Sequence, residues 1–259
     1  MARADTQSRA IRILRRLWPL AFWLIVWHIA SVAVGQQILL ASPEATLRAL
    51  LDLVGTASFW GSIATSLGRI LTGFFLALLA GTALAALASR FVVIRDVLAP
   101  FVQAIKAAPV ASFVILVLIW VPSRHLSIII SFLMVFPIIY TNVLKGIAQT
   151  DVQLLEMARV FAVRPWQRIT HIYVSQALPY FQAGCALALG LCWKSGIAAE
   201  VIGLPANSIG EHLYEAKVYL NTPDLFAWTL VIIALSLVFE KVFNALLNLV
   251  VARIEGGCA

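Results

Sequence analysis

Apolar residues in this chain form long runs, and short segments that carry charges and turn residues separate them. A helix needs about 20 mostly apolar residues to cross a bilayer. Six runs reach roughly that length, so the sequence predicts an all-α membrane protein with about six transmembrane helices. The predicted spans cover residues 17–35, 63–88, 100–121, 126–147, 174–202 and 226–250.

The composition agrees with a membrane protein of one domain. Of the 259 residues, 62% are hydrophobic and only 12% are charged, whereas soluble domains carry about 25% charged residues. Hydrophobicity extends along the whole length, which predicts a single transmembrane domain over 17–250, a cytoplasmic N-terminal segment over 1–16 and a cytoplasmic tail over 251–259. The first apolar run lacks a small-residue cleavage site, so we expect a retained span rather than a removed signal peptide.

Lysine and arginine are distributed unevenly between the two sides, and cytoplasmic segments of membrane proteins carry the excess. With the N-terminus in the cytoplasm, the cytoplasmic segments hold twelve of these residues and the outer segments hold three. This bias predicts that both termini and residues 148–172 face the cytoplasm. Anchoring against anionic lipid then explains the formal net charge of +7, and no nucleic acid partner is required.

Two outer segments carry specific signals. Ser42-Pro43-Glu44 precedes the sequence ATLRALLDLV, which predicts a capped amphipathic helix along the outer surface. The last outer loop, over 204–225, contains three acidic residues, and it is either a docking surface or a solvated loop.

The segment over 151–184 is an island of charges and turn signals between two predicted spans. Asp151 is a predicted N-cap, and apolar residues recur after it at helical spacing. Arg164-Pro165 should end this helix, because the residue before a proline disfavours the helical conformation. Pro165 is suited to open a second short helix over 166–174, which gives a helix–turn–helix at the cytoplasmic face. A basic loop held against lipid headgroups is the alternative interpretation.

This segment resembles the cytoplasmic loop signature of the permease subunits of ABC importers. The signature reads Glu-Ala-Ala, three residues and Gly, with Ile-x-Leu-Pro and a further Leu-Pro downstream. The matching positions are Glu156, Ala158, Arg159, Trp166, Arg168, Ile172 and Leu178-Pro179. Met157, Ala162 and Ser175 stand where the signature has Ala, Gly and Pro. Ala162 in place of Gly predicts a turn that stays within right-handed backbone conformations.

The resemblance extends over nearly the whole chain, and residues 193–203 and 208–242 are similar to permeases of the nitrate, sulfonate and taurine class. It implies a permease subunit of a type I ABC importer that pairs as a homodimer and receives its solute from an extracytoplasmic solute-binding protein. A coupling helix is implied to dock on ABC ATPase subunits, two in the complex. The residues implied to make this contact are Glu156, Met157, Ala158, Arg159, Phe161, Ala162, Arg164, Pro165, Trp166 and Arg168. The class implies a small anionic solute, which is nitrate, a sulfonate such as taurine, or bicarbonate; a heterocycle or vitamin precursor is the alternative.

The sequence contains no nucleotide-binding signature of its own. Lys194-Ser195 resembles the end of a P-loop, but Trp193 occupies the place of the required glycine. We therefore expect no catalytic residue, cofactor or metal site in this chain, with ATP and Mg²⁺ bound by the partner ATPase. A secondary transporter would show two related halves, and an intramembrane enzyme would gather His, Asp or Ser at one depth; the sequence indicates neither.

Lys194 and Glu200 are ionisable residues within the fifth predicted span, where charges are costly and often functional. They are the candidates for residues of the translocation pathway, and a cationic Lys194 suits an anionic solute. The alternatives are that Lys194 pairs with a carbonyl or an acid on a neighbouring helix and that Glu200 lies near the outer end of its span. Arg69 is expected to extend its charge to the membrane interface.

Overall fold

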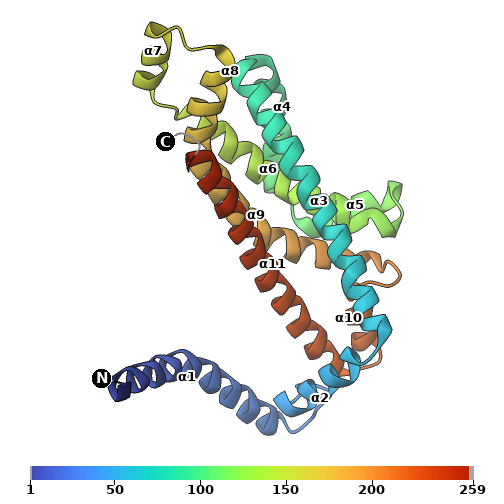
Figure 1. Ribbon diagram of the computed structural model, residues 1–259. Coiled ribbons are helices and arrows are strands. Elements are labelled where there is room, and N and C mark those ends of the chain that lie inside the picture. Colours follow the sequence, from blue (N-terminus) through green and yellow to red (C-terminus); the bar gives the residue numbers. More distant parts are fainter. Residues whose placement is uncertain (1, 257–259) are drawn as a thin grey trace. The chain divides into compact units, whose positions relative to one another are not determined.

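The computed structural model describes the backbone of residues 2–256 and the side chains of residues 18–249 and 251 (Figure 1). None of the described residues forms a strand, so the predicted all-α class is confirmed. Parts of the predicted terminal segments, residue 1 and residues 257–259, lie outside the described residues. The helices are α1 (Ala2–Val34), α2 (Pro43–Val54), α3 (Ala57–Arg90), α4 (Val92–Ala107), α5 (Val110–Trp120), η1 (Ser123–His125), α6 (Leu126–Ala148), α7 (Val152–Val160), α8 (Pro165–Arg168), η2 (Ile169–Tyr173), α9 (Val174–Gly203), α10 (Ile209–Val218) and α11 (Thr222–Gly256).

Contacts divide the chain into two compact units, and each is described by itself. One unit holds the chain up to Trp60 together with His212–Val231, and the other holds Gly61–Glu211 and the chain from Ile232 onward. This division reflects contacts within the chain and does not locate the ends of the transmembrane domain. The predicted limits of that domain at 17 and 250 therefore stay a prediction.

Four helices are long and apolar enough to cross a membrane, and they agree with four of the predicted spans. They are Ala57–Arg90, Ser123–Ala148, Pro165–Gly203 and Thr222–Leu249. A fifth span results if the bent pair α4–α5 is counted as one. The first predicted span corresponds to a shorter apolar helix, Trp18–Val34. The structure therefore supports four or five spans within its described part, and the number six stays a prediction.

The third predicted span, over 100–121, is wrong as a single helix. α4 ends at Ala107 and α5 begins at Val110, and the two helices are bent by 110°. Ala108 and Pro109 between them are extended, with ψ of 140° and 137°. Proline has no N–H to donate and disfavours the helical conformation in the residue before it, so the helix breaks here.

The first unit is held together by polar and aromatic contacts around α2. Ser42 caps α2 as predicted, because its Oγ accepts a hydrogen bond from the Ala45 N–H at 3.2 Å. Trp27 stacks on Phe226 with ring centroids 5.4 Å apart, and its Nε1 donates to the Ala41 carbonyl at 3.0 Å. The loop before α2 is thereby fastened to α1.

In the second unit, α6 and α9 pack against each other along their lengths (Figure 1). Glycines permit this approach where the helices are closest. A Cβ at Gly146 would lie 3.0 Å from the Cα of Ala177, and a Cβ at Gly196 would lie 2.7 Å from Ile70 Cγ1 and 2.8 Å from Ser131 Oγ. Small residues play this role in membranes, where helices associate by close packing rather than by escape from water.

We predict that Gly196→Ala destabilises the protein by about 1–3 kcal/mol, because the new methyl group overlaps side chains of α3 and α6. Thermal unfolding of the detergent-purified protein measures the effect. Gly190→Ala is the matched control, because a Cβ at Gly190 meets nothing within 4 Å. Equal midpoints for the two variants would contradict the packing described for Gly196.

Candidate functional site

The segment that follows α6 begins as its sequence predicts. Asp151 caps α7, and its Oδ1 accepts a hydrogen bond from the Gln153 N–H at 2.8 Å. The cap fixes where α7 starts relative to the end of α6 at Ala148. In Figure 1, α7 lies beyond the ends of α6 and α9; residues 149–151 join it to α6, and residues 161–164 join it to α8.

The turn after α7 contradicts the expectation for Ala162. This residue has φ of +50°, in the left-handed region. Its N–H donates to the Arg159 carbonyl at 3.1 Å, and the Val163 N–H donates to the Ala158 carbonyl at 2.9 Å. These two bonds form a Schellman motif, whose left-handed position usually holds glycine. Ala162 therefore adopts the geometry for which the signature has Gly, and the signature itself was the signal that pointed to it.

The second short helix, predicted over 166–174, begins where the sequence predicts but does not end there. Pro165 opens α8 at the first helical position, after an extended Arg164. α8 then continues through a π-helical stretch, η2, directly into α9. Since Pro165–Gly203 forms one candidate span, the second short helix is the first part of a transmembrane helix.

The residues implied to contact an ATPase are gathered in one short segment, and most of them are exposed. Phe161 is 74% exposed and Trp166 is 72% exposed, and arginines flank both. Ala158 is fully buried and serves packing, and Arg168 is partly buried. The other members, which are Glu156, Met157, Arg159, Ala162, Arg164 and Pro165, are exposed. Exposed aromatics beside arginines are typical of protein interfaces.

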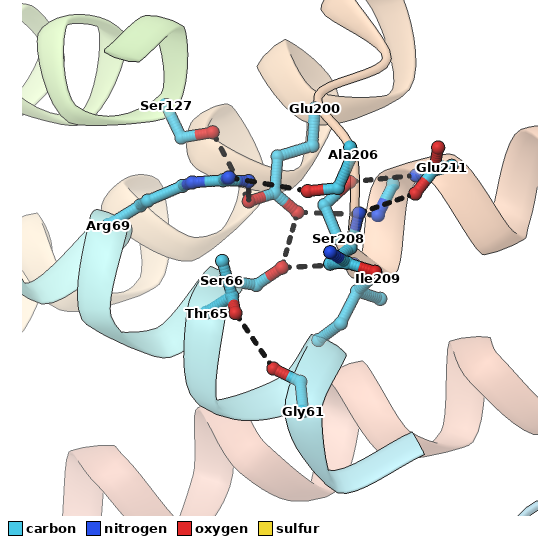
Figure 2. A network of polar contacts seen from close by, with 12 residues as sticks. Gly61, Thr65, Ser66, Arg69, Ser127, Glu200, Ala206, Ser208, Ile209 and Glu211 are labelled. Carbon is cyan, nitrogen blue, oxygen red and sulfur yellow. Dashed lines mark hydrogen bonds and ion pairs between the residues drawn. The ribbon is translucent and has the colours of Figure 1, made fainter. Parts of the chain in front are cut away.

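A second polar site surrounds Glu200 in the last turn of α9 (Figure 2). The side chain is completely buried. Its Oε2 accepts hydrogen bonds from Ser66 Oγ at 2.7 Å and from the Gly210 N–H at 3.3 Å. Its Oε1 accepts one from Ser127 Oγ at 3.3 Å and lies 3.9 Å from Arg69 Nη1. The carboxylate thus joins α3, α6 and the start of α10 to α9.

The loop between α9 and α10 is fastened by the same groups. The Ile209 N–H donates to Ser66 Oγ at 2.9 Å, and Arg69 Nη2 donates to the Ala206 carbonyl at 3.3 Å. Gly210 is needed for this approach, because a Cβ there would overlap Glu200. The sequence did not reveal this network, since its members are distant along the chain. The one signal in the sequence was that Glu200 and Arg69 both lie within predicted apolar spans.

The two pathway candidates are not brought together. Lys194 is exposed on α9, between buried Trp193 and Ser195, whereas Glu200 is buried. No ion pair among the described side chains includes Lys194. The Arg69 side chain is only 15% exposed and faces Glu200, and the expectation that its charge extends to the membrane interface stays a prediction. A pathway role for either candidate stays a prediction.

The described residues contain no group of three or more His, Cys, Asp or Glu side chains able to hold an ion. Cys185 and Cys192 are buried in α9, and Cys192 Sγ donates to the Ile70 carbonyl at 3.8 Å. The cysteines described are therefore packing residues.

Glu200→Ala is expected to destabilise the protein by roughly 3–5 kcal/mol, since it leaves Arg69 Nη1 and the donors that bind Glu200 without the carboxylate that faces them. Thermal unfolding of the purified protein reports this loss. Glu240→Ala removes an exposed carboxylate from α11 and serves as the matched control. If both variants unfold at the same temperature, the network does not hold these helices.

Ala162→Gly is expected to stabilise the protein by about 1 kcal/mol, because glycine adopts a left-handed conformation without the clash of a Cβ. The control is Ala183→Gly at an exposed position inside α9, where glycine should destabilise by a similar amount. Unfolding midpoints measure both. Destabilisation by Ala162→Gly would show that the turn is not left-handed.

Comparison with known proteins gives these sites a context. The sequence pattern of the family described as binding-protein-dependent transport system inner membrane component matches residues 73–256. An aliphatic sulfonates transport permease protein of Escherichia coli (strain K12) is 30% identical, over 81% of this chain and 80% of its own length. The taurine transport system permease protein of the same organism is 25% identical, over 85% of this chain and 82% of its own. The bicarbonate transport system permease protein of Synechocystis sp. is 29% identical, over 61% of this chain and 56% of its own.

The family match covers more than half of the chain, including the 151–172 loop and most of the Glu200 network. The expected resemblance to ABC importer permeases of the nitrate, sulfonate and taurine class is confirmed by these relatives. The chain belongs to the family of binding-protein-dependent transport system inner membrane components, and it is a multi-pass permease subunit of an ABC transporter in the inner membrane.

Proposed function

We propose that this permease imports a small anionic solute, which an extracytoplasmic binding protein delivers, and that ATP hydrolysis by two partner ATPase subunits drives the import. The observation that carries the coupling is the exposure of Phe161 and Trp166, 74% and 72%, in a charged loop between two spans. Such apolar surface on a water-facing loop favours a protein partner. The orientation that the lysine and arginine bias predicts turns this loop toward the cytoplasm, where ATPase subunits act.

The loop is suited to transmit force because hydrogen bonds define both ends of α7. The Asp151 cap fixes the start of α7, and the Schellman bonds of Ala162 and Val163 fix its end. α8 continues without a loop into α9, so a displacement at Trp166 moves the start of the Pro165–Gly203 helix. Rigid elements of this kind convert small shifts at one site into movements of whole helices.

The proposed division of roles within the loop follows side-chain chemistry. Phe161 and Trp166 fill apolar pockets on the ATPase, and buried aromatics of this kind carry much of the energy of an interface. Glu156, Arg159 and Arg164 form polar contacts at the rim and set the register. A second copy of this chain completes the translocation path, so each of two ATPase subunits receives one loop.

The solute class is inferred from the relatives, whose names specify sulfonates, taurine and bicarbonate. These solutes share a small anionic oxygen group. The binding protein performs most of the selection, and the permease needs only a path that tolerates the shared charge. ATP and Mg²⁺ belong to the ATPase subunits, and this chain contributes no catalytic residue.

The test is co-purification of the chain with tagged ATPase subunits, followed by ATP-driven uptake in proteoliposomes. Glu156→Arg combined with Trp166→Ala should reduce association at least 10-fold, because the loss of one central aromatic alone costs about 2 kcal/mol. Trp120→Ala is the control: Trp120 is 76% exposed at the end of α5, before the start of α6, whereas the loop follows the end of α6. Association and uptake that survive the double change would refute the coupling role.

A further inference from the structure

A lysine within the third predicted span lies at the break between α4 and α5. Lys106 is in the last turn of α4, and its side chain is exposed in the single chain. Its Nζ donates a hydrogen bond to Thr141 Oγ1 of α6 at 3.2 Å. Thr141 donates its own hydroxyl hydrogen to the Pro137 carbonyl at 2.7 Å, so its oxygen is oriented to accept from Lys106. An ammonium group has three hydrogens, and two remain available.

The surroundings of Lys106 favour protein, water or a polar headgroup over lipid tails as its neighbour. Thr141 lies about 10 Å along α6 from the helix end at Ala148, within the apolar part of the span. The 110° bend at Ala108 and Pro109 interrupts the helix, and Pro109 deprives the Ile105 carbonyl of its usual donor. Irregular backbone at membrane depth is tolerated only where protein covers it or where it lines a water-filled cavity. A charged side chain requires the same setting.

No acid balances this charge within the described helices that pack around it. α5 and α6 contain no Asp or Glu, and the single acid of α4, Asp96, is near the opposite end of the helix and faces Arg95 at 3.7 Å. Glu200 of α9 belongs to the Arg69 network. None of the ion pairs among the described side chains includes Lys106. The Lys106 ammonium group therefore keeps two donors available, and its charge requires a polar or anionic neighbour at this depth.

We propose that Lys106, positioned by Thr141, is an anion-binding residue of the translocation path that contacts the sulfonate or carboxylate-like oxygens of the passing solute. A broken helix that presents polar groups within the membrane is an arrangement that transporters use for bound ions and substrates. The site is separate from Lys194. Gly184 of α9 lies against Asn142 of α6, so Thr141 is level with residues near 184, about 15 Å along α9 from Lys194. The inference rests on the proposed import of an anion.

The test is ATP-driven uptake in proteoliposomes that contain the complete transporter and a saturating amount of loaded binding protein, with taurine, ethanesulfonate and bicarbonate as probes. Lys106→Gln should lower the maximal uptake rate about 10-fold or more, since it removes a charge-assisted hydrogen bond. Lys106→Arg should retain most of the rate because it keeps the cation. Thr141→Val should cause a smaller loss in the same direction. Lys241→Gln, which removes an exposed lysine from α11, should leave uptake unchanged.

Three results would overturn the proposal, and each result identifies a different cause of the failure. If wild-type protein transports a probe and Lys106→Gln transports it equally fast, the residue plays no part in the path and the proposed function stands. If Lys106→Gln loses thermal stability or association with the ATPase, the lysine holds the structure or a lipid headgroup instead. If wild-type protein transports none of the three anions, the anionic solute class of the proposed function fails, and this inference fails with it.

Discussion

A polar group inside a bilayer has no water to bind, and this constraint governs the described structure. Hydroxyl side chains within the spans donate to their own helix, as Thr72 does to the Gly68 carbonyl at 2.7 Å and Ser195 to the Leu191 carbonyl at 2.8 Å. Glu200 cannot satisfy itself in this way, because a carboxylate only accepts. It draws donors from α3, α6 and the start of α10. This one carboxylate thereby links four helices.

The helix over Pro165–Gly203 connects the two sites that the second unit presents. Its first turns carry the exposed Trp166, and its last turn carries the buried Glu200. The π-helical stretch at Ile169–Tyr173 lies between them, close to the loop. Such stretches insert one residue into a helix and frequently occur at functional sites. One continuous element therefore joins the loop to the Glu200 network.

Features that depend on a few neighbouring residues were predictable from the sequence. The Ser42 and Asp151 caps and the start of α8 at Pro165 are of this kind, because each acts within three or four residues. Hydropathy also located four long spans, since length and apolar character are local properties. The exposure of Phe161 and Trp166 agrees with the loop that was predicted from charge and turn signals.

Features that depend on packing were not predictable. Pro137 and Pro179 lie inside intact helices, whereas Pro109 stands at a break. All three prolines have apolar neighbours in the sequence. Pro137 and Pro179 differ from Pro109 because their helices, α6 and α9, pack extensively against each other. The pairing of Arg69 with Glu200 likewise requires that α3 and α9 be brought together. No periodicity within one segment contains that information.

Ala162 makes the conformation of the turn after α7 depend on the hydrogen bonds around it. A glycine there would be free to leave the left-handed conformation at little cost, whereas alanine remains in it only while the two Schellman bonds hold. Alanine also has fewer alternative conformations to visit when those bonds open. The shape of the turn consequently depends on two hydrogen bonds and not on the intrinsic preference of its residue. In the proposed coupling role, those two bonds are the contacts that keep α7 and α8 in one arrangement.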